Sequence, residues 1–398
     1  MIGKTDILTQ SNHADQSLAI STDVAPPIHT STTFRFPDNP DELIPVADLE
    51  EPQLGSTDPA PFVYSREFAP NATRLEAILS SICKGHALVY ASGLAAFHAL
   101  LVRLNPKILA LPLGKGYHGI HEVAHVHQRI AGTKIVDSFD TATWDEVGLG
   151  KGDVIHIESP INPSGESYDI AYWANLAHAR GALLTIDSTL GPPGLQNPFE
   201  QGADFVMHSG TKYVGGHSDL LCGILVTQAS TDGWKVWHQL QQERLALGNV
   251  IGNLESWLGV RSLRTMDLRV KRQSQTASEL VNWLAHDNND SNVIRKVLEK
   301  VQHSSLQAED KEWLEKQMPG GFPTIFIIWM KSEAIAKALP SKLRYFQHAT
   351  SLGGVESLIE WRTLSDDRID RRILRISCGI EHVEDLKSDL LQAFQSFL

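Results

Sequence analysis

Cysteine is scarce in this chain, which has only three in 398 residues. Cys83, Cys222 and Cys378 are odd in number and far apart, and each lies in or beside an apolar run. This pattern favours buried free thiols over a disulfide or a metal site, and it fits a reducing compartment.

Clustered basic residues and long hydrophobic runs are also missing. The formal net charge is −12 at pH 7, which argues against the basic surface that nucleic acid binding requires. No stretch approaches the ~20 apolar residues that span a bilayer. The N-terminal residues contain no apolar core of a secretory signal. We therefore expect a cytoplasmic protein with neither a nucleic-acid nor a membrane partner.

Apolar residues make up 42% of the chain and charged residues 21%, as in ordinary globular enzymes. From about residue 72 onward, short apolar runs alternate with helical patterns, which is typical of a parallel sheet covered on both faces. We expect strands at residues 87–90, 108–112, 135–137, 154–157, 183–186, 205–207 and 220–226. The predicted fold class is therefore α/β, with a mainly parallel central sheet and helices on both of its faces.

The composition divides the chain into three segments. Residues 1–60 are rich in Ser, Thr, Asp and Pro, with an acidic stretch at 38–58, and predict an extended arm with loops rather than a packed unit. Residues 61–256 hold the predicted sheet and form a large domain. We expect residues 257–398 to form a smaller C-terminal α+β domain. Its predicted elements are a long helix, two strands and a closing helix at residues 261–287, 322–330, 374–378 and 383–397.

Lys212 has an unusual setting for a lysine. It follows Ser209 and Thr211, precedes a Gly-Gly turn, and lies just ahead of an almost purely apolar run. This context suits a lysine held in a pocket as a Schiff-base nucleophile, the role of the lysine that anchors pyridoxal phosphate (PLP). Asp187 ends an earlier apolar run, where a carboxylate would keep the pyridine nitrogen of that cofactor protonated. A helix cap is the alternative role for Asp187.

The other parts of a PLP site have candidates as well. The turn Ser92-Gly93-Leu94 opens a helical run and predicts a phosphate site, to which the hydroxyls of Ser209 and Thr211 would contribute. Tyr117 is the candidate for stacking on the cofactor ring, with packing in its glycine-rich loop as the alternative. Arg375 alternates with apolar residues on a predicted strand. It would bind the substrate carboxylate, unless it serves an internal salt bridge.

Longer motifs carry a family resemblance. They are Tyr64-Ser-Arg66, Ser92-Gly-Leu-Ala-Ala96, Glu158-Ser-Pro-Ile-Asn-Pro163, Asp187-Ser-Thr189, the lysine motif, Ser351-Leu-Gly-Gly-Val-Glu-Ser357 and Arg375-Ile-Ser-Cys-Gly-Ile-Glu381. With these motifs the chain resembles the PLP-dependent enzymes of Cys/Met metabolism, which include cystathionine γ-synthase, cystathionine lyases, methionine γ-lyase and O-acetylhomoserine sulfhydrylase. The resemblance implies fold type I (aspartate-aminotransferase-like), PLP as cofactor, and a homotetramer built as a dimer of dimers.

The resemblance also implies roles for single residues. Lys212, Tyr117 and Tyr64 would be catalytic, and Tyr64 and Arg66 would reach the phosphate from a neighbouring subunit. Asn162 would approach the phenolic oxygen of the cofactor. The remaining implied contacts are Thr189 to the cofactor, and Thr350, Ser351 and Asn162 to the substrate held by Arg375.

Departures from the family pattern bear on the reaction. Thr350 stands where cystathionine-handling members often have Glu, and Glu67 begins the segment after Arg66 where the family usually has Asn-Pro-Thr. We infer a distal pocket that has lost charged groups suited to a zwitterionic amino-acid co-substrate, which argues against cystathionine itself. The expected reaction is γ-substitution on an O-activated homoserine, such as O-acetylhomoserine, through a vinylglycine-type electrophile. A sulfur or carbon nucleophile, including an enolisable keto acid, would then add at Cγ, as in some fungal biosynthetic relatives.

Three alternatives stay open. The first is a lyase that releases a 2-oxo acid and ammonia, because removal of the α-proton is common to both reactions. The second is a cofactor-binding relative without turnover, against which the full set of site residues argues. The third is a metal site at His118, His121, His125 and His127. We expect no metal there, because no other ligand-rich motif completes the set.

Overall fold

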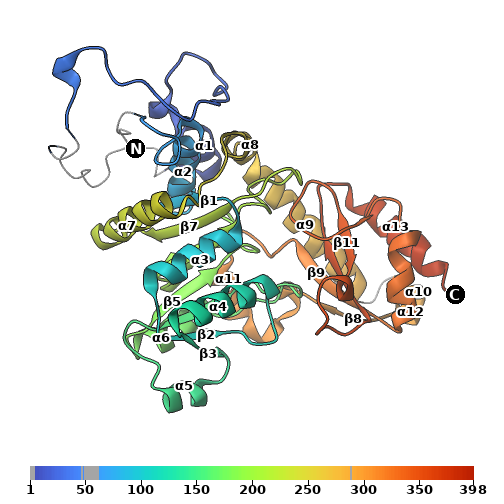
Figure 1. Cartoon of the computed structure of the whole chain (residues 1–398). Coiled ribbons are helices and arrows are strands. Elements are labelled where there is room, and N and C mark those ends of the chain that lie inside the picture. Colours follow the sequence, from blue (N-terminus) through green and yellow to red (C-terminus); the bar gives the residue numbers. More distant parts are fainter. Residues whose placement is uncertain (1–4, 46–47, 49–61, 287–288) are drawn as a thin grey trace.

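The computed structural model describes residues 5–45, 48, 62–286 and 289–398 (Figure 1). Its larger sheet has seven strands in the order β1-β7-β6-β5-β4-β2-β3. Only β7 runs antiparallel to its neighbours, so the sheet is mainly parallel. All seven predicted strands are present. Their bounds are β1 Gly85–Tyr90, β2 Ile108–Leu111, β3 Lys134–Asp137, β4 Val154–Glu158, β5 Leu183–Asp187, β6 Phe205–Ser209 and β7 Gly223–Gln228.

Helices cover both faces of this sheet, because alternate side chains of each buried strand point to opposite faces. On β1, Ala87 and Val89 join one core cluster, whereas Leu88 and Tyr90 join the other. The first cluster is completed by α2 (Pro70–Ile82), α5 (Thr141–Val147), α6 (Ile170–His178), α8 (Asn253–Leu263), α11 (Lys311–Gln317) and the start of α9 (Met266–Ala285). The second is completed by α3 (Gly93–Leu104), α4 (His118–Ala131) and α7 (Thr231–Leu247).

The C-terminal part builds a separate five-stranded sheet in the order β10-β11-β12-β9-β8, seen on the right of Figure 1. Its core cluster contains no residue of the larger sheet. The strands are β8 Leu298–Gln302, β9 Ile325–Met330, β10 Gln347–His348, β11 Leu358–Trp361 and β12 Ile373–Ser377. The helices that pack on it are α10 (Ser291–Val297), α12 (Glu333–Ala338), α13 (Val383–Gln395) and the second half of α9.

The N-terminal segment differs from the extended arm that its composition predicts. Residues Ile7–His13 form helix α1, and Asp15 just beyond it is fully buried. Its carboxylate lies 2.7 Å from Arg74 of α2 and 2.8 Å from Arg264, which follows α8. This buried charge pairing fixes the start of the chain to the large sheet's helices, a long-range contact that composition does not reveal. Most of the acidic stretch at 38–58 lies outside the described residues.

Two further details differ at the level of elements. The long helix expected at residues 261–287 is divided into α8 and α9, and the expected domain boundary after residue 256 falls inside α8.

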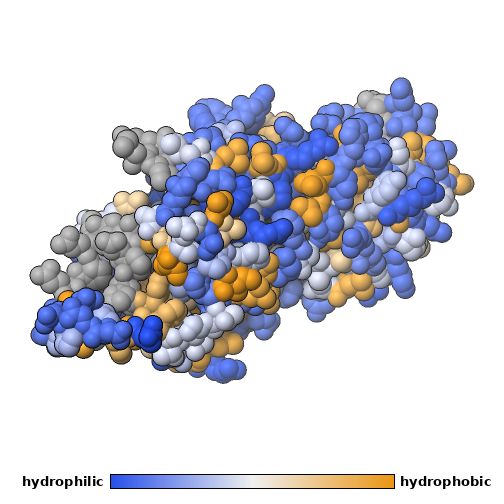
Figure 2. Space-filling view, turned by 90° about the horizontal axis from the view of Figure 1, so that it is seen from above, coloured by the Kyte–Doolittle hydropathy of each residue, from blue (hydrophilic) through white to orange (hydrophobic). Residues whose placement is uncertain are grey.

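Seen from above, hydrophobic residues form small separate patches on a largely hydrophilic face (Figure 2). Within the described residues, no helix is both long and apolar enough to cross a membrane. All three cysteines are buried and free.

Candidate active site

A cavity of about 650 Å³ opens at the carboxyl ends of β4, β5 and β6, where open α/β sheets bind ligands. Loops and strands of the smaller sheet form its opposite wall. Thirteen of the fifteen residues predicted from the sequence line it: Ser92, Gly93, Leu94, Tyr117, Asn162, Asp187, Thr189, Ser209, Thr211, Lys212, Thr350, Ser351 and Arg375. The fold therefore gathers motifs that are separated by up to 283 residues, the interval from Ser92 to Arg375.

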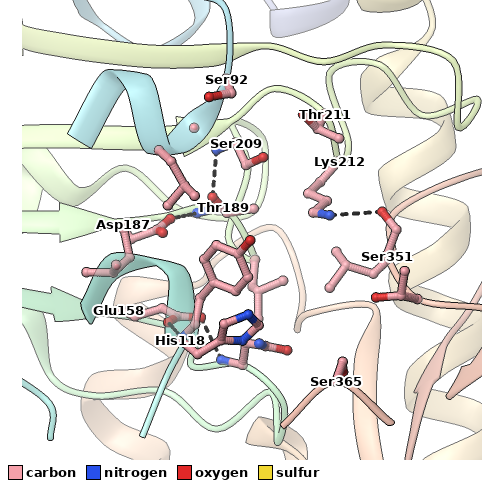
Figure 3. A pocket seen from close by; sticks show the side chains of 18 of the residues that line it. Ser92, His118, Glu158, Asp187, Thr189, Ser209, Thr211, Lys212, Ser351 and Ser365 are labelled. Carbon is pink, nitrogen blue, oxygen red and sulfur yellow. Dashed lines mark hydrogen bonds between the residues drawn. The ribbon is translucent and has the colours of Figure 1, made fainter. Parts of the chain in front are cut away.

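Lys212 lies in the turn after β6, with its amine directed across the cavity. Its Nζ donates a hydrogen bond to Ser351 Oγ at 2.9 Å (Figure 3). Burial, together with the positive charge of Arg375, lowers the pKa of Lys212 to about 8. A neutral amine is the nucleophilic form, so this shift makes Lys212 reactive near physiological pH.

Two carboxyl groups lie side by side at the floor of the cavity. Glu158 and Asp187 are paired residues at the last positions of β4 and β5, and both are buried. Burial raises the pKa of both groups, and for Glu158 the negative charge of Asp187 adds to the rise. Glu158 accepts hydrogen bonds from the backbone N–H groups of Tyr117 (2.8 Å) and Asn162 (2.7 Å). It thereby fixes the two loops that carry these residues.

The first turn of α3 has the features that an anion site requires. Ser92 caps the helix by accepting the N–H of Ala95 at 3.1 Å. The N–H groups of Gly93 and Leu94 find no acceptor within the described part of the chain. A Cβ on Gly93 would stand only 3.2 Å from that of Ser209, so glycine permits the close approach of β6. Free N–H groups at a helix start favour a phosphate.

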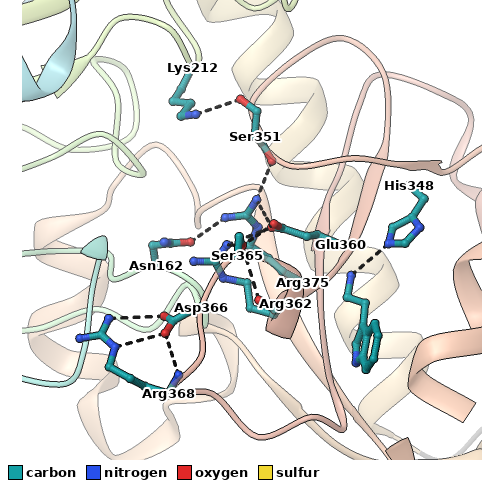
Figure 4. A network of polar contacts seen from close by, with 11 residues as sticks. Asn162, Lys212, His348, Ser351, Glu360, Arg362, Ser365, Asp366, Arg368 and Arg375 are labelled. Carbon is teal, nitrogen blue, oxygen red and sulfur yellow. Dashed lines mark hydrogen bonds and ion pairs between the residues drawn. The ribbon is translucent and has the colours of Figure 1, made fainter. Parts of the chain in front are cut away.

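Arg375, on β12 of the smaller sheet, lines the cavity and is almost fully buried (Figure 4). Its Nη1 donates to Asn162 Oδ1 at 2.8 Å, and its Nη2 donates to the carbonyl oxygen of Ser351 at 2.7 Å. The same Nη2 lies 2.7 Å from Glu360 Oε2. The internal salt bridge considered for Arg375 therefore exists, and the arginine also lines the cavity. Ser351 has a φ of +80°, a conformation that non-glycine residues rarely adopt.

Sequence reasoning missed a second arginine. Arg362 lines the cavity near Arg375, together with Ser365. The distal pocket therefore keeps one charged side chain, Arg362, that the inferred loss of charged groups did not include. A signal was present in the sequence, because Glu360 and Arg362 alternate with Trp361 at the end of β11 and so point to one face of the sheet. His118 also lines the cavity, and its buried Nδ1 has no hydrogen-bond partner among the described residues.

Tyr64 and Arg66 are the two predicted residues that this chain does not bring to its own cavity. Tyr64 is 43% exposed. The guanidinium of Arg66 lies 5.3 Å from the Tyr64 ring centre and donates to the carbonyl oxygen of Leu245 at 3.0 Å. Their contribution from a neighbouring subunit stays a prediction.

The four histidines at 118–127 lie on α4. In the part of the chain that the structure describes, no group of three or more His, Cys, Asp or Glu side chains is placed to hold a metal ion.

Comparison with known proteins decides the family. The model of the family described as Cys/Met metabolism PLP-dependent enzyme matches residues 5–395. The chain belongs to this family. Among its relatives, the cystathionine γ-lyase of Bacillus subtilis is 31% identical over 88% of this chain and 93% of its own length. The chloroplastic cystathionine β-lyase of Arabidopsis thaliana is 29% identical over 87% of this chain and 75% of its own length.

Solved structures of similar proteins agree with the fold. MetB from Corynebacterium glutamicum superposes with a TM-score of 0.84 at 27% identity, with all of both chains covered. CalE6, a methionine γ-lyase from Micromonospora echinospora, gives a TM-score of 0.81 at 28% identity, covering 98% of this chain and 99% of its own. The expectations of a fold type I enzyme and of PLP as its cofactor are confirmed.

The residues that line the cavity have the chemistry that PLP binding requires, independently of the family comparison. The cavity contains an amine with a lowered pKa, a helix start with free N–H groups, and an Asp187 carboxylate whose Oδ1 accepts the N–H of Thr189 at 2.9 Å. In the described residues no arginine or lysine forms a salt bridge with Asp187, so a protonated ring nitrogen would supply the missing cationic donor.

Proposed function

We propose that this enzyme is a PLP-dependent carbon–sulfur lyase that cleaves a thioether amino acid, with one water, to a thiol, a 2-oxo acid and ammonia. The observation that carries the proposal is the placement of Lys212 Nζ beside Ser351 and near Arg375, where it can reach the Cα proton of a substrate whose carboxylate Arg375 holds. The named relatives at up to 31% identity are cystathionine β- and γ-lyases, which favours elimination over substitution.

Each residue of the site would have a defined task. The first turn of α3, with Ser92, Gly93 and Leu94, would hold the phosphate, assisted by the hydroxyls of Ser209 and Thr211. Asp187 would accept the ring N–H, with Thr189 orienting its carboxylate. Tyr117 would stack on one ring face, which its 40% exposure leaves open. Asn162 accepts a hydrogen bond from Arg375 at Oδ1, and among the described residues its amide Nδ2 has no acceptor, so it could donate to the cofactor.

Bound PLP would supply the capacity to withdraw electrons from the substrate's Cα. Arg375 and the backbone at Ser351 and Thr350 would orient the α-carboxylate. Lys212 has a pKa of about 8 and is therefore neutral above about that pH. It would take the proton from Cα and return it to another carbon of the substrate. Tyr64 of a second subunit would stand near the leaving group, and its Arg66 near the phosphate, in a homotetramer built from such dimers.

The second candidate is γ-substitution on an O-activated homoserine such as O-acetylhomoserine. One observation favours it: the rim of the cavity is exposed at Leu221 and Tyr117, so a sulfur or carbon nucleophile could enter after the leaving group departs. Both reactions begin with the same proton removal at Cα, which the residues described above perform.

A product screen by mass spectrometry separates the two. The purified enzyme with PLP would receive cystathionine, methionine or O-acetylhomoserine, the last with cysteine, hydrosulfide, methanethiol, acetoacetate or no nucleophile. We expect pyruvate or 2-oxobutanoate from a thioether without any nucleophile. An adduct formed only from O-acetylhomoserine plus one nucleophile would replace the lyase by the synthase. Lys212→Ala is the control: any product that it forms at the same rate as the wild type comes from free PLP and not from the enzyme.

A further inference from the structure

Arg362 lies at the start of the short helix η9 (Arg362–Leu364), directly after β11. Its side chain is only 3% exposed, yet it lines the cavity together with Ser365. In Figure 3, Ser365 lies at the opposite end of the view from Ser92, which marks the expected phosphate end. Arg362 therefore belongs to the end of the cavity that would hold the far arm of a substrate.

The hydrogen bonds of Arg362 are concentrated on one side of its guanidinium. Nη1 donates to Glu360 Oε2 at 3.1 Å and to Ser365 Oγ at 2.5 Å (Figure 4). Nε is buried and has no hydrogen-bond partner among the described residues. The edge formed by Nε and Nη2 presents two parallel N–H groups, the geometry that matches both oxygens of a carboxylate.

The charges around Arg362 leave room for an anion. Glu360 Oε2 contacts both Arg362 and Arg375, at 3.1 and 2.7 Å, so one carboxylate serves two guanidinium groups. The acidic residues that line the cavity within the described chain are Glu158 and Asp187, which lie at the ends of β4 and β5 on the proposed cofactor side. Neutral Thr350 stands at the rim. Two other carboxylates act on Arg362, but both are already paired: Glu360 with Arg375 and Asp366 with Arg368. Among the described residues, the far end thus offers a cation for a carboxylate and no unpaired acid for an ammonium group.

We propose that Arg362, oriented by Glu360 and Ser365, binds a carboxylate at the end of the substrate's far arm, and that this subsite does not require an amino group on that arm. The inference rests on the proposed function, because it assumes that Arg375 holds the α-carboxylate. It assigns a substrate class: amino acids whose side chain ends in a carboxylate.

Three ligands of equal chain length without a cleavable bond test this directly. L-2-aminooctanoate ends in a methyl group, L-2-aminosuberate in a carboxylate, and 2,7-diaminosuberate in a complete amino acid. Their binding to the holoenzyme would be measured by calorimetry and by the visible absorbance of the cofactor. Because none of them can be cleaved, the result does not depend on whether the enzyme is a lyase or a synthase.

We expect aminosuberate to bind roughly tenfold or more tightly than aminooctanoate, the range for a charge-assisted hydrogen bond. Diaminosuberate should bind no more tightly than aminosuberate. In Arg362→Gln this preference should disappear, with aminooctanoate binding unchanged within about threefold. Arg371→Gln is the matched control, because Arg371 is 70% exposed and pairs with Glu333 away from the cavity.

Two results would overturn the proposal. Equal weakening of all three ligands in Arg362→Gln would mean that Arg362 acts only by positioning Glu360 and Arg375. A wild-type enzyme that prefers diaminosuberate strongly over aminosuberate would mean that the far end recognises an ammonium group. Thermal unfolding and the cofactor content of each variant would be measured alongside, and Arg362→Lys, which keeps the charge but loses the fork, should recover part of the preference.

Discussion

Glu360 and Arg375 face each other across the β11–β12 pair, and their side chains meet at 2.7 Å between Oε2 and Nη2. Both residues are buried, at 3% and 4% exposure. Burial opposes the ionisation of Glu360. The pKa of Glu360 is nevertheless lowered, because Arg375, Ser365 and Arg362 act together on its carboxylate. This carboxylate therefore stays charged and fixes both cations of the substrate wall.

The first prediction concerns Glu360→Gln. Removal of the shared charge leaves two buried guanidinium groups near each other, and we expect unfolding to become easier by about 3 kcal/mol. Urea denaturation measures the change. Glu333→Gln, which removes the partner of exposed Arg371, should cost less than about 0.5 kcal/mol. If both substitutions changed the free energy of unfolding by the same small amount, the ion pairs of Glu360 with Arg362 and Arg375 would contribute no more than an exposed pair.

The second prediction concerns Lys212→Ala. Without the amine, reduction with borohydride should no longer add the mass of the cofactor to the protein, since no covalent link can form. Activity should fall by roughly 10²- to 10⁴-fold or more, because the Cα proton loses its base. Non-covalent PLP binding should persist through α3 and Asp187. Retention of the mass increase would assign the attachment to another lysine.

The third prediction concerns pH. Burial and Arg375 lower the pKa of Lys212 from 10.5 to about 8, so the amine is protonated below that pH and neutral above it. The rate at which cofactor-free enzyme attaches PLP should therefore rise through about pH 8 and then level off. In Arg375→Gln the loss of a nearby positive charge should move the midpoint upward. A wild-type midpoint near 10.5 would contradict the predicted environment of Lys212.

The fourth prediction concerns the N-terminal segment. Asp15 is fully buried between Arg74 and Arg264, so Asp15→Ala leaves charges without their partner. We expect a loss of about 3 kcal/mol in the free energy of unfolding. Asp232→Ala, at an exposed pair with Lys235, is the control and should change little. Wild-type stability in Asp15→Ala would mean that the pairing of Asp15 with Arg74 and Arg264 contributes nothing to stability.

The strands of the larger sheet, with β9 and β12 of the smaller one, were predictable because each is an apolar run bounded by turns. Strands β8, β10 and β11 were missed, because they are short or carry polar residues. Lys212 and Asp187 were predictable because they end or follow such runs, where parallel strands place their carboxyl ends together. The alternation of Glu360 and Arg362 was a weak signal, since β11 is only four residues long and two alternating charged residues are as typical of an exposed edge as of a cavity wall. Helix α1 was missed because its stability depends on Arg74 and Arg264, more than 50 residues away.

The sequence alone determined the fold class, the cofactor and thirteen of the residues around the cavity, because these depend on local runs and motifs that no distant contact alters. Only the tertiary structure decided which charges face the substrate. Glu360 joins Arg375 to Arg362 through strand pairing across β11 and β12, and pairing between strands is set by the packing of the whole sheet rather than by neighbours in the chain.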